Sequence, residues 1–457
     1  MDASMAVETE PGLFAPGLRA VSLAALVLVS LLAFEAMAVA TAMPAIAAAL
    51  AGLDRYALAF GATLATSVIG MVAAGTDCDR RGPGRATAVG LALFACGLLL
   101  AALAATMPVL IAGRVLQGLG SGALGVTLYV VVGRLYPPAL RPRLFAMFSA
   151  AWVIPALVGP AVAAMLVDLL GWPWVFLSAL LALPPVAAAV LPAARRLGPP
   201  ARAASGGSPP IAAAVVAALA ALALHELASA SGTASPWSVL SALVVLSVAS
   251  ARLLPQGTLR AARGLPSVIA LRGLVAGAFF AAEAFLPLWL NLQQGWSHQA
   301  AGFALTAGAL CWSIGSHCQG RVRDPRARQR VLAAGLALLT TALALLAVLA
   351  ALGQATWAVL AWALVGLGIG LAFPSLSVLL LTLSPEHEQG RHSSALQLAD
   401  ALATTAALAL VGALFVALRD SSPAAAFVAV FGGAAALAML ARVLSARTVP
   451  RAVSVPA

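Results

Sequence analysis

The sequence predicts an all-α polytopic membrane protein, from its composition and from the length of its apolar runs. Of its 457 residues, 62% are hydrophobic and only 9% are charged, whereas a soluble domain carries about 25% charged residues. A fold in water could not hide so much apolar surface, so the surroundings must be lipid. One crossing takes roughly 20 apolar residues in a helix, and the chain is long enough for fourteen crossings joined by short loops.

The apolar runs fall into groups of six, two and six. They predict helices at 18–48, 56–76, 86–106, 108–133, 143–167 and 172–193, then a shorter pair at 211–230 and 236–254, then 266–290, 299–320, 330–352, 355–383, 393–418 and 423–443. The sequence thus predicts two six-helix bundles with two extra helices between them. If the shorter pair is a surface hairpin, the protein crosses twelve times instead.

The domain boundaries follow from this order. We expect polar tails at 1–17 and 446–457, an N-terminal bundle at 18–195 and a C-terminal bundle at 266–445. The linker, 196–265, contains the extra helices after a Pro/Gly/Ser-rich stretch.

All 26 basic residues are arginine, and their distribution predicts the topology. With the N-terminus in the cytoplasm, the outer loops contain only Arg55 and Arg419, and Arg114 and Arg272 lie inside helices. All the others fall on the cytoplasmic side, as the positive-inside rule requires. Charge scattered in this way does not indicate nucleic-acid binding. We expect a monomer in a bacterial inner membrane.

The four cysteines form no CxxC pair, so neither disulfides nor a metal site are expected. Cys78 falls in a predicted cytoplasmic loop and the others fall in helices. The sequence contains no phosphate-binding GxxxxGK[ST] loop and no HExxH motif. It therefore predicts neither an enzyme nor a cofactor.

The two six-helix groups resemble each other. Residues 114–122 are similar to residues 362–370, an offset of 248, and Glu35 has Glu283 at the same offset. The spacing Gly-x-x-x-Asp after the second helix recurs at 75–79 and 320–324. Internal repeats with a binding site between them are the usual architecture of secondary transporters.

Several motifs resemble those of the major facilitator superfamily. The loop 75–85 resembles the signature between its helices two and three, and 110–120 resembles its fourth-helix signature. Residues 155–164 resemble the antiporter signature of helix five, with Pro155 and Ala163-Ala164 where glycines are expected. Glu35, nine residues before Pro44, is similar to the first-helix acid of fourteen-helix drug:proton antiporters. The resemblance implies proton-coupled export of small amphipathic compounds by alternating access.

Glu35 is the leading candidate for proton coupling. An ionised carboxylate in the middle of a lipid-embedded helix is costly, so the group can take a proton and release it when its cavity opens to water. Arg114 lies at a compatible depth and is its expected partner, and Glu283 is its repeat mate. The alternative for Glu35 and Arg114 is a fixed structural ion pair.

Glu283 lies in a helix rich in aromatic residues. It could hold a cationic substrate by charge and cation–π attraction, act as a second proton site, or be a packed neutral acid. Asp400 could line the cavity or cap a cytoplasmic gate. The residues expected at the substrate are Met37, Gln117, Phe279, Phe280, Glu283, Trp289, Gln397 and Asp400.

A second set of residues is expected to act in gating. Asp79 can accept hydrogen bonds from the N-terminus of a neighbouring helix, and Gly82 and Gly84 allow a tight loop. By resemblance, Gly159 and Pro160 kink the fifth helix. The gating residues are Asp79, Arg80, Gly82, Arg85, Gly159 and Pro160.

Two other functions are compatible with the sequence. One is a substrate-specific metabolite exporter or proton symporter on the same fold. The other is a receptor or scaffold that does not transport, against which the costly acids within the helices argue. In every case the expected partners are a small molecule, protons and the lipid bilayer.

Overall fold

The computed structural model describes residues 12–52, 55–200, 210–229, 236–296, 298–419 and 421–448. These residues form fourteen α-helices and three short 3-10 helices. Parts of the predicted tails and of the linker, 1–11, 201–209 and 449–457, lie outside the described residues. The helices are α1 (Arg19–Ala49), α2 (Tyr56–Arg81), α3 (Pro83–Ala102), α4 (Met107–Leu135), α5 (Arg141–Leu170), α6 (Pro173–Arg196), α7 (Ile211–Ser229), α8 (Pro236–Leu253), α9 (Leu265–Leu292), α10 (His298–Gly320), α11 (Pro325–Leu352), α12 (Ala358–Leu383), α13 (Gln389–Arg419) and α14 (Pro423–Leu444).

The helices have the length and composition of membrane spans. In the described part of the chain, nine are long and apolar enough to cross a bilayer, and α5 is a tenth if its two bent halves form one span. The extra pair is apolar but shorter, over Ile211–Leu224 and Trp237–Leu253. The predicted all-α polytopic membrane fold is confirmed, and the choice between fourteen and twelve crossings stays a prediction.

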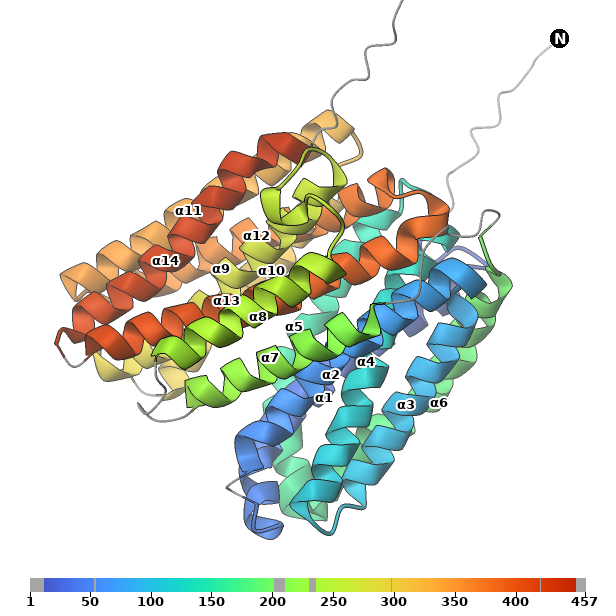
Figure 1. The fold of residues 1–457 in the computed structure, drawn as a ribbon, viewed down its shortest axis with the longest axis horizontal. Coiled ribbons are helices and arrows are strands. Elements are labelled where there is room, and N and C mark those ends of the chain that lie inside the picture. Colours follow the sequence, from blue (N-terminus) through green and yellow to red (C-terminus); the bar gives the residue numbers. More distant parts are fainter. Residues whose placement is uncertain are drawn as a thin grey trace, which may run out of the picture.

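The helices assemble into two bundles (Figure 1). In the first, α1 packs on α5 and α6, and α4 packs on α2 and α3. In the second, α12 packs on α10 and α11, while α9 packs on α13 and α14. The bundles meet along two seams, one of α2 and α4 against α13 and one of α5 against α10 and α12. Any movement of one bundle against the other must change these seams.

The sequence repeat is also a repeat in packing. A Cβ added to Gly118 would collide with the backbone of Thr63 on α2, and one added to Gly366 would collide with the backbone of Gly308 on α10. The same correspondence holds for Gly120, where a Cβ would lie 2.5 Å from the Phe94 amide nitrogen, and for Gly368, at 2.7 Å from that of Leu339. Because only glycine permits such close helix approach, both halves pack their second, third and fourth helices alike.

The extra pair connects the bundles. Helices α7 and α8 lie across the seam between α2 and α13 in Figure 1. The pair shares an apolar cluster with residues of α2 and α13 that includes Val68, Ala217, Leu246 and Leu402. The seam between α2 and α13 is therefore covered, on its apolar side, by helices that belong to neither bundle.

The predicted end of the second helix is wrong. Helix α2 continues to Arg81, so Cys78 and Asp79 lie in its last turns rather than in a loop. Basic residues at 80 and 81 favour the C-terminal end of a helix, which extends α2 beyond its apolar run. Gly82 alone makes the turn, with φ +82°, and Pro83 starts α3. Gly84 is helical, and its predicted role in the turn is wrong; a Cβ there would lie 2.8 Å from the Arg195 Cα.

Candidate functional site

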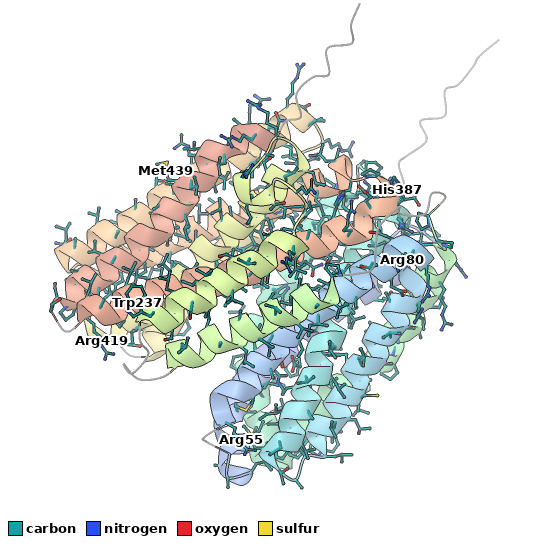
Figure 2. The ribbon with its side chains drawn as sticks, in the orientation of Figure 1. Arg55, Arg80, Trp237, His387, Arg419 and Met439 are labelled. Atoms are coloured by element: carbon teal, nitrogen blue, oxygen red, sulfur yellow. The ribbon has the colours of Figure 1, made fainter. Side chains whose placement is uncertain are left out.

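The two bundles have arginine-bearing ends that lie close together. Figure 2 shows Arg80 and His387 near each other at one end of the molecule, and Arg55 and Arg419 at the far ends of their bundles. We call the end with Arg80 and His387 the arginine-rich end. The sequence predicts that this end faces the cytoplasm.

A buried polar cluster lies inside the N-terminal bundle. Glu35 of α1 accepts a hydrogen bond from Nη1 of Arg114 on α4, and the two residues are 6% and 4% exposed. The guanidinium Nε lies 3.4 Å from the Ala59 carbonyl of α2, which completes a junction of three helices. The contact that the sequence predicts between Glu35 and Arg114 is present.

Gln117 belongs to the same cluster. Its Oε1 accepts from Nη1 of Arg114, so one guanidinium nitrogen serves both side chains. The residue is fully buried, and its Nε2 has no hydrogen-bond partner among the described residues. A buried amide nitrogen left without a partner is costly, and it gives the cluster a donor that is free to bind another group.

The corresponding place in the C-terminal bundle has different chemistry. The repeat mate of Arg114 is Trp362, whose ring stacks on Phe279 with centroids 5.1 Å apart. Phe280 and Trp312 extend this aromatic cluster, each within 5.2 Å of Phe279. Glu283 is half-buried and has no ion pair or hydrogen bond within the described chain. It is an unpaired acid one helical turn beyond two phenylalanines.

A second ion pair was not predicted. Arg272 of α9 donates through Nε to both carboxylate oxygens of Asp400 on α13, at 2.8 and 2.9 Å. Helix α13 starts at Gln389, four residues earlier than predicted, so Asp400 lies about 16 Å from its end at 1.5 Å per residue. Asp400 is therefore paired with Arg272, and its role as a substrate contact stays a prediction.

Arg272 also bonds to α12. Its Nη1 donates to the Phe373 carbonyl at 3.1 Å and to the Ser377 hydroxyl at 2.9 Å, and its guanidinium carbon lies 3.5 Å from the centre of the Phe373 ring. The Ser377 hydroxyl is 3.2 Å from that of Tyr129 on α4, in the other bundle. Sequence analysis missed this chain of contacts, although Tyr129 and Ser377 have the repeat offset of 248.

Asp79 joins the bundles at the arginine-rich end. Its carboxylate oxygens accept from the backbone amides of Gly390 and Arg391, both at 2.7 Å. These amides belong to the first turn of α13, where a negative charge is favoured. Gly75 allows the approach, since a Cβ there would lie 2.8 Å from the Gly390 carbonyl oxygen. Asp79 has the partner that the sequence predicts, while its role in gating stays a proposal.

The gating role of Arg80 and Arg85 stays a prediction. Arg80 and Arg85 are exposed, and Arg85 lies 3.7 Å from Asp77 in its own bundle. Arg134 of α4 reaches across to the other bundle, donating from Nη2 to the Glu386 carbonyl at 3.1 Å. Sequence analysis placed Arg134 on this side but gave it no role.

Helix α5 bends at a different position from the one expected. The halves Arg141–Pro155 and Leu157–Leu170 meet at 40°, one turn before Gly159 and Pro160, so the predicted kink position is wrong. Pro155 has no N–H for the Ala151 carbonyl, and the Ser30 hydroxyl of α1 donates to that carbonyl at 2.9 Å. The bend opens an apolar groove of about 320 Å³, lined by Val27, Ser30, Leu31 and Phe34 of α1 and by Ile154, Pro155, Val158, Gly159 and Val162 of α5.

The remaining candidates lie apart from one another. Met37 lies beside this groove, where a Cβ on Gly159 would be 3.4 Å from its Cβ. Gln397 of α13 contacts Gly125 of α4 across the seam. Trp289 is fully buried and packs on Phe431 with ring centroids 5.5 Å apart, a position for core packing rather than for substrate contact. In the described residues, no cluster of His, Cys, Asp and Glu has the arrangement of a metal site.

Two bundles built on one repeated packing, with charged pairs buried inside their helices, define the architecture of a secondary transporter. The sequence profile of the Major Facilitator Superfamily matches residues 25–408, and the chain belongs to that superfamily. It is a multi-pass membrane transporter and not an enzyme.

Related proteins share this assignment. The chain is 27% identical over 357 residues to a probable multidrug-efflux transporter of Mycobacterium tuberculosis, which covers 74% of each chain. It is 35% identical over 138 residues to multidrug resistance protein 3 of Bacillus subtilis, covering 30% of this chain and 27% of that one.

Solved structures show the same fold at low identity. A human organic anion transporter superposes with a TM-score of 0.68 at 18% identity, covering 94% of this chain and 100% of the other. A bacterial homologue of the iron transporter ferroportin in an outward-facing state gives a TM-score of 0.66 at 15% identity, covering 94% and 99%.

Proposed function

We propose that the protein is a proton-coupled exporter of small amphipathic compounds in a bacterial inner membrane. The observation that carries the proposal is the buried cluster of Glu35, Arg114 and Gln117. It holds a titratable acid in the middle of α1, a fixed cation and an unpartnered donor. The multidrug-efflux names of the related proteins support the substrate class.

The charge of Glu35 is coupled to the packing of the helices through Arg114. When ionised, the carboxylate is stabilised by the guanidinium, and both are nearly excluded from water. A proton that binds to a carboxylate oxygen forms a neutral acid and frees Arg114 from its counter-charge. A buried charge without its partner is strongly unfavourable, so protonation favours a rearrangement of α1 against α4.

Alternating access follows from where the bundles touch. Asp79 and Arg134 close the arginine-rich end through contacts with α13 and with the Glu386 carbonyl. In the proposed cycle these contacts break as the bundles rock, and the site is exposed to the other side of the membrane.

The substrate class follows from two surfaces. The groove at the bend of α5 is almost wholly apolar and suits the hydrophobic part of a ligand. Glu283 has no counter-charge within the described chain and lies beside Phe279 and Phe280, so it suits a cationic group held by charge and by the aromatic faces. A compound with both parts is an amphipathic cation.

Proteoliposomes test this function. With wild-type protein, the pH of the lumen should change only when a fluorescent amphipathic cation is supplied, because proton and substrate movements are coupled. Glu35→Gln should abolish the proton flux while leaving substrate binding measurable. Asp168→Asn is the control, since Asp168 is exposed near the end of α5, and it should transport normally. Substrate-dependent proton flux that survives in Glu35→Gln would contradict the proposal.

A further inference from the structure

Arg272 links Asp400 to the seam between the bundles. Its guanidinium holds Asp400 of α13 through Nε and Ser377 of α12 through Nη1. The Ser377 hydroxyl meets that of Tyr129, which belongs to α4 in the N-terminal bundle. One continuous chain of polar contacts therefore runs from the carboxylate of the C-terminal bundle to the opposite bundle.

We propose that Asp400 is a second proton-binding site, and that its charge determines whether the bundles stay together at the arginine-rich end. The proposal concerns a different acid from Glu35. It rests on the proposed function only in that the bundles separate during transport.

The physical reason is the fate of Arg272. The Arg272 side chain is 8% exposed and that of Asp400 is 22% exposed. While Asp400 is ionised, Arg272 has a counter-charge and stays fixed to Ser377. When a proton binds to a carboxylate oxygen of Asp400 and forms an O–H bond, Arg272 keeps its own proton and loses that counter-charge. An uncompensated buried cation is strongly unfavourable, and opening the seam relieves it by admitting water.

The N-terminal pair cannot act in this way. Glu35, Arg114 and Gln117 all belong to one bundle, so protonation of Glu35 breaks no contact between bundles. Arg272, the partner of Asp400, donates to the Ser377 hydroxyl, and that hydroxyl contacts Tyr129 of the other bundle. Glu35 therefore acts on packing inside the N-terminal bundle, and Asp400 acts on the contact between the bundles.

Other charged groups on the packed elements lie further along the helices. Glu283 of α9 is 11 residues beyond Arg272, about 16 Å at 1.5 Å per residue. Arg419 lies at the opposite end of α13, and Arg114 of α4 lies inside the N-terminal bundle. The remaining charged groups whose side chains the structure describes lie toward the arginine-rich end: Asp77, Asp79, Arg80 and Arg81 of α2, Arg134 of α4, Arg252 of α8, Glu386, His387 and Glu388 in the turn before α13, Arg391 and His392 of α13, and Arg442 of α14. Arg272 is thus the charged group that pairs with Asp400 in the described structure.

Cys78 is a native reporter of the seam. It is fully buried, and a Cβ on Gly390 of α13 would lie 2.9 Å from its Cβ. Replacing Cys96, Cys311 and Cys318 by serine in the full-length chain leaves Cys78 as the target of N-ethylmaleimide. The protein is reconstituted in liposomes, and alkylation rates are measured from mildly acidic to mildly alkaline pH.

We call the chain with these three serines the parent. At each pH, the alkylation rate of Cys78 in the parent is divided by the rate in the parent that also carries Asp400→Asn. This ratio cancels the intrinsic pH dependence of the thiol. Because Asn mimics the neutral acid, the parent should react about tenfold more slowly at alkaline pH, a difference of about 1.4 kcal/mol in opening. The ratio should approach one as the pH falls. Asp400→Glu, which keeps the charge, should restore the behaviour of the parent.

Tyr129→Phe tests the chain of contacts separately. It removes only the hydroxyl that meets Ser377, and should raise Cys78 alkylation at alkaline pH. Tyr136→Phe is the matched control, because the Tyr136 hydroxyl bonds Ser22 within the N-terminal bundle at 2.8 Å. A parent-to-Asp400→Asn ratio of one at every pH, or equal effects of the two tyrosine variants, would overturn the proposal. The readout needs no substrate, so such a result would leave the efflux proposal standing.

Discussion

In the N-terminal bundle a buried carboxylate, Glu35, meets a guanidinium, Arg114. At the repeat-related place Glu283 has no ion pair in the described chain, and Trp362, the repeat mate of Arg114, stacks on Phe279. The glycines that set the helix spacing are repeated in both halves. The polar chemistry is not. The fold therefore requires the repeated glycine packing in both halves. It does not require the ion pair, because the equivalent position in the C-terminal half has an aromatic stack instead.

The same contrast appears at Asp79 and Asp324, which are related by the repeat. Asp79 accepts backbone amides from α13 of the opposite bundle. Asp324 accepts the amides of Arg326 and Ala327, in the first turn of the helix that follows it. One acid joins the two bundles and the other only caps its own helix, so the halves contribute unequally to closure.

Removing Arg114 should give the largest effect. Arg114→Met leaves Glu35 buried without a counter-charge, which costs about 3–5 kcal/mol. Thermal unfolding in detergent should show the loss, and it should shrink in acid, where Glu35 can bind a proton. Adding Glu35→Gln should recover most of the stability, and the double-mutant cycle measures the coupling.

Trp362→Met is the matched variant in the other half. It loses packing but leaves no charge exposed to a new environment, so its cost should not vary with pH. A pH dependence like that of Arg114→Met would mean that the two sites are not chemically different.

The repeated glycines should behave alike. Gly118→Ala and Gly366→Ala each force a Cβ against a backbone, and overpacking costs about 1–3 kcal/mol. Thermal unfolding should show similar losses in both. Gly412→Ala in α13 is the control, since nothing lies within 4 Å of its Cβ position, and it should lose no stability. A loss of stability in only one of Gly118→Ala and Gly366→Ala would show that the two halves do not depend on the same packing.

Much of the fold could be predicted because apolar run length and glycine spacing are local features. Each of the fourteen predicted segments is a helix in the structure, and the similar depths of Glu35 and Arg114 made them expected partners. The boundary of α2 was wrong because arginines lengthen a helix beyond its apolar run. The bend of α5 was wrong because the resemblance to the antiporter signature put it at Gly159, whereas the lost hydrogen bond belongs to Pro155.

The pair of Arg272 and Asp400 could not be predicted in the same way. The residues are 128 positions apart, and the rotation that brings α9 and α13 face to face depends on packing throughout the bundle. Arg272 inside an apolar helix was a usable signal that some acid must be near. Nothing in the sequence identified which acid.

Asp79→Asn should have an intermediate effect. An amide has one acceptor oxygen in place of the two that Asp79 uses, so one charge-assisted hydrogen bond worth about 1.5 kcal/mol is lost. Cys78, buried beside this contact, should be alkylated faster by N-ethylmaleimide. Asp77→Asn is the control, because Asp77 pairs with Arg81 and Arg85 in its own bundle. Equal Cys78 alkylation rates in Asp79→Asn and Asp77→Asn would show that Asp79 does not hold the bundles together.

Asp324→Asn should have the smallest effect, and its pH dependence distinguishes a cap from a gate. Hydrogen bonds from the amides of Ala327 and Arg326 hold the pKa of Asp324 below its usual range. The unfolded value is about 3.9, so the stabilisation is complete above that pH and is lost as the pH falls through the lower folded value. The variant should unfold slightly earlier than wild type at neutral pH and together with it in strong acid. Cys78 alkylation should not change, because Asp324 bonds only to α11; faster alkylation would mean that both repeat-related acids control the seam.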